Sequence, residues 1–224
     1  MDLLFTPAKL GTCELKNRIV RSATNGHLSE EKGQVTPLWA DTLIELAKNE
    51  VGLVITGHFC VDKMQRADAG QPVLDETTDE SLLRRACDGV HRYGGKLFFQ
   101  LSHSGIKGVE SVNGAPPKHP EDFTREELDR LVEQFAFAAK KCKESGADGV
   151  QVSGIDFNRR AGQKTPFYLD ALICEPDFAA KLKSGAQDGS KCLACNGCYT
   201  IYRKRFVRCV QHQDEIEQFK TIPW

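Results

Sequence analysis

A pattern of strand followed by helix repeats four times between Arg18 and Gly154 and then stops. Each strand segment is short and apolar, and amphipathic helical segments lie between the strands. This alternation is typical of a parallel sheet covered by helices, because a parallel connection needs a crossover and a helix provides it. Four units are too few to close a parallel barrel, whose chemistry is carried on loops from all of its strands.

Local patterns set the boundaries of the expected elements. Strands are expected at residues 18–23, 51–56, 96–101 and 150–153. Helices are expected to begin near Thr36, Glu80 and Thr124, and the Thr124-x-x-Glu127 segment has the form of a capping box. The first seventeen residues are interpreted as a small hairpin below the sheet. Two stretches are interpreted as loops, residues 62–79 and 102–123.

The amino-acid composition limits the classes of molecule that this protein is expected to bind. The chain has 224 residues, a formal net charge of −1 and a pI near 6.6, so it has no global basic field to attract polyanions. Residues 202–205 form the one short basic run where nucleic-acid binding could be argued, and a charge run is usually a solvated surface. The N-terminal segment lacks a targeting pattern, and no segment approaches membrane-spanning length. We therefore expect a cytoplasmic protein with no nucleic-acid or membrane partner.

The nine cysteines fall into two groups. Five are scattered singly through apolar or helical contexts and are expected to be small buried thiols: Cys13, Cys60, Cys87, Cys142 and Cys174. Four are clustered with the spacing C-x2-C-x2-C-x10-C: Cys192, Cys195, Cys198 and Cys209. This spacing suits thiolate ligands of an iron–sulfur cluster or of zinc, while unligated cysteines remain the alternative.

The alternation alone does not separate a barrel from an open doubly wound sheet, although the absence of Gly-x-Gly-x-x-Gly after the first strand disfavours a Rossmann unit. The segments at the strand ends are more specific. They are Asn17–Thr24, Val54–His58, Phe98–Gly105 and Gly146–Val152. In sequence and order they resemble the old yellow enzyme family of FMN-dependent NAD(P)H:flavin oxidoreductases, from Leu3 to about Gly154 and again from Leu172 to Cys198. Between these two blocks the second half-barrel of the family is missing.

The resemblance implies an α/β fold, a partial (β/α) TIM barrel of about four parallel strands with flanking helices and a Cys-rich C-terminal tail. The expected division is a half-barrel over residues 1–155, a junction with a remnant of the last barrel helix over 156–190, and the Cys-rich tail over 191–224. The tail resembles the cysteine segment of 2,4-dienoyl-CoA reductases, which ligates a [4Fe–4S] cluster there and has a third interval one residue longer.

The resemblance also assigns roles at the strand ends. Ser22, Ala23 and Thr24 would lie along one edge of the flavin, with Asn25 as a possible extension. Gly57 would let the flavin ring approach the second strand, and Gln100 would place its amide on the pyrimidine side. The alternative for each is packing within the barrel. Two histidines interpreted as loop residues, His58 and His103, are weaker candidates.

Several positions depart from the family pattern. Ser153 and Asp156 stand where members usually carry a His and then a His or Asn that polarise the substrate oxygen. Asp170-Ala171 replaces a Gly-Arg pair that contacts phosphate, and the other phosphate-binding loops belong to the missing half. We expect the chain alone to bind FMN weakly and to catalyse little, and the catalytic residues stay unassigned.

Three functions remain open at this point. The first is an FMN-dependent oxidoreductase that passes hydride from NAD(P)H to an activated alkene or quinone. The second is a non-catalytic half-barrel remnant, and the third is a metal- or iron–sulfur-binding protein that works through its tail. Four strands leave open edges and an exposed inner face, so pairing of two copies into a homodimer is expected.

Overall fold

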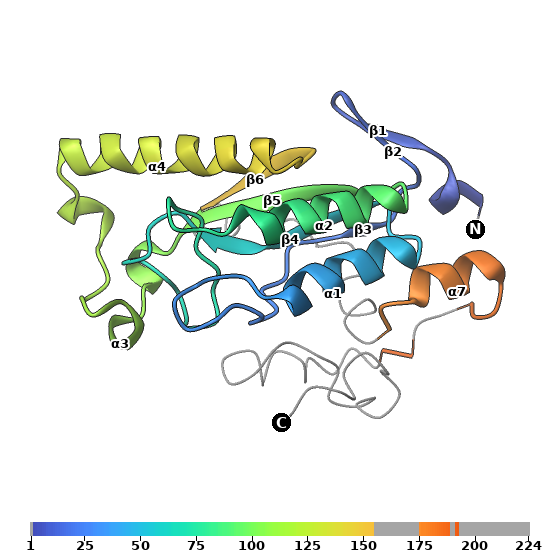
Figure 1. The fold of residues 1–224 in the computed structure, drawn as a ribbon, viewed down its shortest axis with the longest axis horizontal. Helices are drawn as coiled ribbons and strands as arrows, with labels where there is room; N and C mark the ends of the chain where they lie inside the picture. Colours follow the sequence, from blue (N-terminus) through green and yellow to red (C-terminus); the bar gives the residue numbers. More distant parts are fainter. Residues whose placement is uncertain (1, 155–174, 189–190, 193–224) are drawn as a thin grey trace.

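The computed structural model describes residues 2–154, 175–188 and 191–192 (Figure 1). Its strands are β1 (Ala8–Leu10), β2 (Cys13–Leu15), β3 (Val20–Arg21), β4 (Leu53–Cys60), β5 (Lys96–His103) and β6 (Gly149–Gly154). Its helices are α1 (Pro37–Lys48), α2 (Glu80–Arg92), α3 (Glu110–Asn113), α4 (Arg125–Glu144) and α7 (Phe178–Ser184), with short 3-10 turns η1 (Asp2–Phe5), η2 (Gly105–Lys107) and η3 (Pro120–Asp122). No helix within these ranges is long and apolar enough to cross a membrane.

The main sheet has the order β3-β4-β5-β6, and every neighbouring pair of its strands is parallel. Each crossover contains a helix, and α1, α2 and α4 run alongside one another next to the sheet (Figure 1). The antiparallel hairpin of β1 and β2 lies at one end of the strands, and α3 lies at the other end. The predicted parallel four-stranded sheet with flanking helices is therefore confirmed.

An aromatic cluster fills the space between the sheet and the first helix. The ring of Trp39 on α1 lies 5.6 Å from that of Phe59 and 6.1 Å from that of Phe99, measured between centroids. Alternate residues of β5, namely Leu97, Phe99 and Leu101, are fully buried on this helix-covered face. The intervening residues of β5 point to the opposite face, which would be the interior of a closed barrel.

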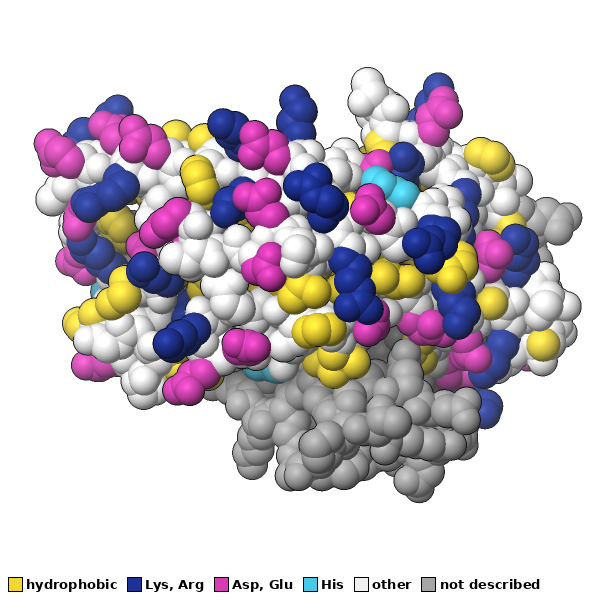
Figure 2. All heavy atoms as spheres, viewed as in Figure 1, with side chains coloured by type: hydrophobic (Ala, Val, Ile, Leu, Met, Phe, Trp, Pro, Cys, Tyr) yellow, Lys and Arg dark blue, Asp and Glu magenta, His cyan; other side chains and the backbone are white. Residues whose placement is uncertain are grey.

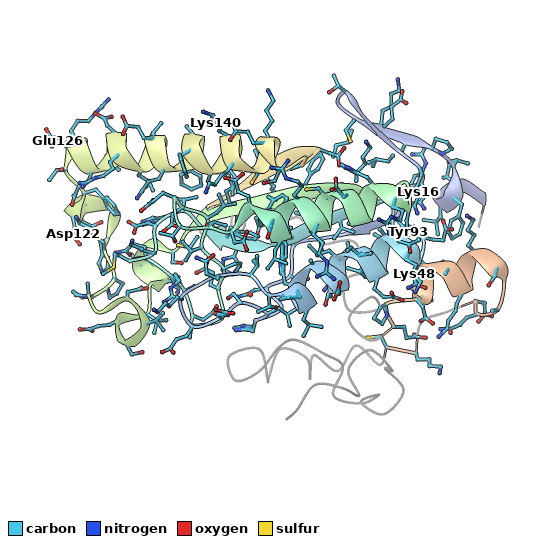
Figure 3. All side chains as sticks on the ribbon, in the orientation of Figure 1. Lys16, Lys48, Tyr93, Asp122, Glu126 and Lys140 are labelled. Carbon is cyan, nitrogen blue, oxygen red and sulfur yellow. The ribbon has the colours of Figure 1, made fainter. Side chains whose placement is uncertain are left out.

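One lysine joins two helix ends at the hairpin end of the strands. The Nζ of Lys16 donates to the carbonyl of Ala47 at 3.1 Å and to that of Tyr93 at 2.8 Å, and these carbonyls lie at the C-terminal ends of α1 and α2. Figure 3 labels Lys16 and Tyr93 at this end of the molecule. A cation at these positions satisfies orphan carbonyls and complements both helix dipoles.

A second polar cluster closes the same end. The carboxylate of Asp148 accepts hydrogen bonds from Nζ of Lys96 at 2.8 Å, Nε2 of His91 at 2.7 Å and the amide of Leu97 at 2.9 Å. Burial raises the pKa of this carboxyl, but the three hydrogen bonds outweigh burial and hold the pKa below its ordinary value. The cluster fixes the start of β6 against α2 and β5.

Some boundaries differ from the sequence-based expectation. The first strand pairs only at Val20 and Arg21. Its start is delayed because the side chain of Asn17 accepts the amide hydrogen of Ile19. The third strand continues to His103, and the segment expected to be a loop after it contains η2, α3 and η3. Asn113 of α3 is buried because its side chain exchanges hydrogen bonds with the backbone of Arg66, a long-range contact that local patterns do not reveal.

The two flanks of the sheet differ. Near β3, helix α7 contributes the buried residues Phe178 and Leu182 to the core and lies beside the end of α1 (Figure 1). An ion pair of 3.0 Å joins Lys183 to Glu50 at this flank. At the opposite flank the strand β6 is paired on one side only among the described strands, and its residues Val150 and Val152 are exposed.

Candidate functional site

The residues expected at the site lie after β3 and in the C-terminal halves of β4 and β5. Ser22, Ala23 and Thr24 directly follow β3, Gly57 lies within β4, and Gln100 lies within β5. In parallel sheets this end of the strands carries the functional loops. It is the end where α3 and the long connections gather in Figure 1.

Gly57 is placed directly against the segment that follows β3. A Cβ atom on Gly57 would lie 2.6 Å from the carbonyl oxygen of Thr24 and 2.9 Å from Cα of Asn25, so a larger residue would force the two strand ends apart. The register between β4 and β5 shifts between Ile55 and His58, which marks an irregularity at this point. Packing within the chain thus supplies a reason for this glycine, and its role in approaching a flavin stays a prediction.

A small cavity lies beside this contact. It measures about 70 Å³ and is lined by Arg21, Thr24 and Gly57 together with Trp39 and Leu43 of α1. Pockets that enclose a cofactor-sized molecule are typically several hundred Å³. Thr24 and Gly57 therefore line the same cavity, which is too small to enclose a flavin.

Gln100 lies one strand away and faces the interior side of the sheet. Its side-chain Nε2 donates to Oε1 of Gln151 on β6 at 2.8 Å, and its backbone amide donates to Oγ1 of Thr56 at 3.1 Å. The residues on either side of Gln100 are buried on the helix-covered face, so alternation places the amide pair on the opposite face. This polar pair is a second feature of the strand ends, separate from the cavity beside Gly57.

His58 belongs to β4 and is half-buried, which corrects its interpretation as a loop residue. Oε1 of the buried Gln71 accepts the amide hydrogen of Ala67 at 2.6 Å, so its Nε2 donates to Nδ1 of His58 at 2.7 Å. Nδ1 is therefore an acceptor, and the imidazole carries its proton on Nε2. Burial lowers the pKa of His58, which agrees with this neutral form.

A second histidine was missed by sequence reasoning. Nδ1 of His27 lies 3.1 Å from Oδ1 of Asp68, and both side chains are almost fully buried. Nδ2 of Asn25 donates to Oδ2 of the same carboxylate at 3.0 Å, which ties the loop after β3 to the loop after β4. His27 has a positive φ of 52°, an uncommon conformation for a residue other than glycine. Nothing local in the sequence pairs residues 41 positions apart, so only the fold reveals this contact.

His103 is also within a strand, at the end of β5, and so corrects the same expectation. Its Nδ1 accepts the amide hydrogen of Gly105 at 3.1 Å, and its ring lies edge-on to Phe123 at 5.8 Å between centroids. Burial lowers the pKa of His103. The contacts show a histidine that shapes the turn after β5.

Of the two positions that depart from the family pattern after the fourth strand, Ser153 lies in β6 and pairs with Ser102 of β5. Asp156 lies outside the described residues, as do Asp170 and Ala171. The first of the two positions therefore carries the hydroxyl of Ser153, which lies on the fourth strand of the main sheet.

The scattered cysteines that the structure describes behave as buried thiols with one exception. Burial raises the pKa of Cys60, Cys87 and Cys142 to about 12, so these side chains remain protonated. Cys13 is partly exposed. Cys174 and the tail residues Cys195, Cys198 and Cys209 lie outside the described residues, whereas Cys192 is half-buried.

No group of three or more His, Cys, Asp or Glu side chains within the described part of the chain is arranged to hold a metal ion. The iron–sulfur cluster or zinc ion suggested by the cysteine spacing gains no support from this part of the structure. It stays a prediction about the tail.

Comparison with known protein families identifies the family to which these strand-end motifs belong. Residues 3–156 match the model of the NADH:flavin oxidoreductase / NADH oxidase family. The chain belongs to this family. Membership implies FMN as the cofactor and a nicotinamide as a substrate of the family, and it confirms the resemblance seen in the strand-end motifs.

Curated relatives in the family match about two thirds of this chain. A metal reductase from Desulforamulus reducens is 34% identical over 169 residues, which are 68% of this chain and 24% of the relative. An NADPH dehydrogenase from Listeria monocytogenes is 30% identical over 162 residues, which are 68% of this chain and 48% of the relative. The chain thus spans between about a quarter and about a half of the curated relatives it matches.

Solved structures give the same result for the fold. The old yellow enzyme homologue from Zymomonas mobilis has a TM-score of 0.60 at 23% identity, with 66% of this chain and 47% of that chain covered. Morphinone reductase in complex with tetrahydroNAD has a TM-score of 0.58 at 20% identity, with coverage of 74% and 56%. These coverages agree with a half-barrel of the old yellow enzyme fold.

Proposed function

We propose that this chain forms the isoalloxazine side of an FMN site in an NAD(P)H-dependent oxidoreductase. FMN supplies hydride transfer from NAD(P)H to an electron acceptor, which in this proposal is an activated alkene or a quinone. The observation that carries the proposal is the amide pair of Gln100 and Gln151 on the interior face, beside the strand ends where family members work.

The retained residues would bind and orient the ring. Gln100 has both a donor and an acceptor on one planar amide, which matches the alternating polar rim of a flavin. The backbone that follows β3 at Ser22, Ala23 and Thr24 would supply further polar groups, and Gly57 keeps this backbone close to β4. These residues position a cofactor, and the residue that would polarise the acceptor stays unassigned.

The chain alone should bind FMN only weakly. The cavity beside Gly57 is about 70 Å³, and the amide pair of Gln100 and Gln151 is exposed. An open face leaves much of a ligand in water and gives up the burial that drives tight binding. We therefore propose weak FMN binding and low NAD(P)H oxidation for the purified chain.

Flavin binding by the purified protein tests this proposal. FMN is titrated against the wild-type protein, Gln100→Leu and the matched control Gln134→Leu on α4, and quenching of flavin fluorescence is followed. Losing the amide pair should weaken binding roughly fivefold, because a hydrogen bond is worth about 1 kcal/mol. The control should bind as the wild type does.

Two results would contradict the proposal. One is wild-type protein that leaves flavin fluorescence unchanged up to millimolar concentrations of protein. The other is equal affinity of Gln100→Leu and the wild type while both remain folded by circular dichroism. A slow oxidation of NADH or NADPH in the presence of FMN and a quinone would extend the proposal to catalysis.

We also infer a cytoplasmic location. The buried thiols of Cys60, Cys87 and Cys142 support it, since free cysteines of this kind persist in a reducing compartment.

A further inference from the structure

The side chain of His58 lies on the face of the sheet that carries the amide pair of Gln100 and Gln151. His58 is in register with Gln100 across β4 and β5, and residues in register on parallel strands share a face. Its Nδ1 is 3.2 Å from Oγ of Ser102, which follows Gln100 by two residues and so faces the same way. The next residue of β4, Phe59, belongs instead to the aromatic cluster on the helix-covered face. The imidazole is therefore a further polar group on the amide-bearing face.

An irregularity in β4 turns His58 to this face. Between the paired positions Ile55–Phe98 and His58–Gln100, β4 has two intervening residues and β5 has one. Strict alternation from Ile55 would send residue 58 to the helix-covered face, so the extra residue reverses its direction. Bulges of this kind re-aim a side chain and are over-represented next to active sites.

Gln71 fixes which ring nitrogen of His58 carries the proton. Oε1 of the buried Gln71 accepts the amide hydrogen of Ala67 at 2.6 Å, so its Nε2 donates to Nδ1 of His58 at 2.7 Å. An imidazole whose Nδ1 accepts carries its proton on Nε2. The direction of this N–H is thus set before any ligand arrives.

The Nε2–H of His58 has no acceptor among the residues that the structure describes. Both side-chain hydrogen bonds of the ring, with Gln71 and with Ser102, involve Nδ1. A half-buried donor of this kind gains a hydrogen bond when a ligand brings an acceptor to it. Burial lowers the pKa of His58, so the ring is an uncharged donor at neutral pH.

The neighbours of this N–H indicate the chemistry of the acceptor. Gln100, Gln151 and Ser102 are polar and uncharged, whereas Figure 2 shows acidic and basic side chains interspersed over the face formed by α1, α2 and α4. A neutral donor beside amides suits a carbonyl oxygen better than a phosphate, which is bound best by charged donors and helix N-termini. Both molecules of the proposed reaction carry such an oxygen, since the isoalloxazine has ring carbonyls and a quinone has ketone carbonyls.

We propose that His58 binds a carbonyl oxygen of a ligand at the strand ends through its Nε2–H, with Gln71 as the positioning residue that fixes its tautomer. The inference rests on the proposed FMN site and adds a contact residue to it. A hydrogen bond to a flavin carbonyl would hold the ring, and one to the carbonyl of the electron acceptor would polarise it. For the second role the position of Ser153 offers only a hydroxyl.

Nitrogen-15 NMR of histidine-labelled protein tests the proposal, because it reads the protonation of each ring nitrogen directly. At neutral pH His58 should show a protonated Nε2 and an unprotonated Nδ1, and Gln71→Leu should divide the proton between the two nitrogens. His103 is the matched control in the same sample. Its Nδ1 accepts the amide hydrogen of Gly105, which gives the same tautomer, while alternation from Leu101 places it on the helix-covered face. Through-bond connections to the backbone assign the signals in the wild-type protein.

FMN and the unreactive ketone cyclohexanone are then added separately and together. The Nε2 signal of His58 should shift with FMN alone if the flavin supplies the oxygen, and only with cyclohexanone if the electron acceptor supplies it. The signals of His103 should not move in either case. His58→Phe should weaken binding of the ligand that causes the shift roughly fivefold, the usual effect of losing one neutral hydrogen bond.

A proton on Nδ1 of His58, or an Nε2 signal that neither ligand moves, would overturn the proposal. An unchanged tautomer in folded Gln71→Leu, or equal ligand affinity of folded His58→Phe and the wild type, would overturn it as well. The titration of the wild-type protein decides the contact even if a variant fails to fold. Unchanged flavin fluorescence would refute the FMN site separately, and the cyclohexanone titration would still decide the contact of His58.

Discussion

At the scale of single residues, Asp148 shows how one carboxylate joins three elements. It collects hydrogen bonds from α2, from the lysine at the start of β5 and from the backbone of β5, just before β6 begins. Its pKa lies below the ordinary value of 3.8, so the folded state favours the ionised form more than the unfolded chain does. The stability that this provides is present above about pH 4 and is lost as the pH falls through the folded pKa.

Asp148→Asn should remove this stabilisation. At pH 7 the free energy of unfolding should fall by about 1.5–3 kcal/mol, the usual range for hydrogen bonds to a charged group. The difference from wild type should shrink as the pH falls from about 4 toward the lowered pKa of the folded carboxyl, because the wild-type side chain then becomes protonated too. Urea denaturation at a series of pH values measures both effects.

Asp129→Asn is the matched control, because Asp129 pairs with Arg125 in an exposed position on α4. Its effect should stay below about 0.5 kcal/mol. If Asp148→Asn and Asp129→Asn lowered the free energy of unfolding equally at pH 7, the cluster around Asp148 would contribute no more stability than an exposed ion pair.

At the scale of elements, the ends of α1 and α2 depend on the same side chain. Lys16 follows the hairpin in sequence and reaches the last carbonyls of both helices. Burial lowers the pKa of Lys16, and the nearby carboxylate of Glu50 partly opposes this shift. The segment that follows the hairpin therefore stabilises both helix ends through one amine.

Lys16→Met should lower the free energy of unfolding by about 1–2 kcal/mol, since two carbonyls lose a charged donor while the aliphatic part is kept. Lys9→Met is the control, because Lys9 pairs with Glu14 on the exposed surface of the hairpin. Thermal unfolding followed by circular dichroism compares the two. A loss for Lys9→Met as large as that for Lys16→Met would contradict the role of the shared cap.

The helix starts could be predicted from the sequence, because the residues that cap a helix are close together in the chain. The capping box at Thr124 and Glu127 is confirmed by both of its hydrogen bonds, and the predicted helix starts near Thr36 and Glu80 match α1 and α2. The late start of β3 could not be predicted, because Asn17 takes the amide hydrogen of Ile19 through its side chain. A pattern of apolar residues does not contain that competition.

The candidate site was predictable only in part. The motifs identified the family and placed Gln100 in the third strand and Gly57 directly after the second. In the structure the second strand continues to Cys60, so Gly57 and Gln100 both lie within neighbouring strands. The contacts of His58 with Gln71 and of His27 with Asp68 could not be predicted, because they join loops that meet only after the sheet forms. Such pairs depend on tertiary geometry rather than on spacing along the chain.

At the scale of the whole molecule, stability depends on the face between the sheet and its helices. Trp39, Phe59 and Phe99 form a mutually contacting aromatic group, and the last two are fully buried. The opposite face carries the amide pair of Gln100 and Gln151 beside the partly buried Ile55 and Phe98. The core is therefore concentrated on the helix-covered side of the sheet.

Phe59→Ala should cost about 3–5 kcal/mol, which is a large part of the ~5–15 kcal/mol typical of a domain. Urea denaturation followed by far-ultraviolet circular dichroism measures the loss. Phe137→Ala on α4 is the control, because that ring is 42% exposed and should cost much less. Similar costs for the two variants would mean that the aromatic group is not the centre of the core.

The position of α7 has a consequence for protein engineering. Its residues Phe178 and Leu182 are buried in the core, and the helix lies beside the end of α1 (Figure 1). A designer who shortens the chain before residue 178 would therefore have to provide new apolar cover for the side of α1 that the deletion leaves bare.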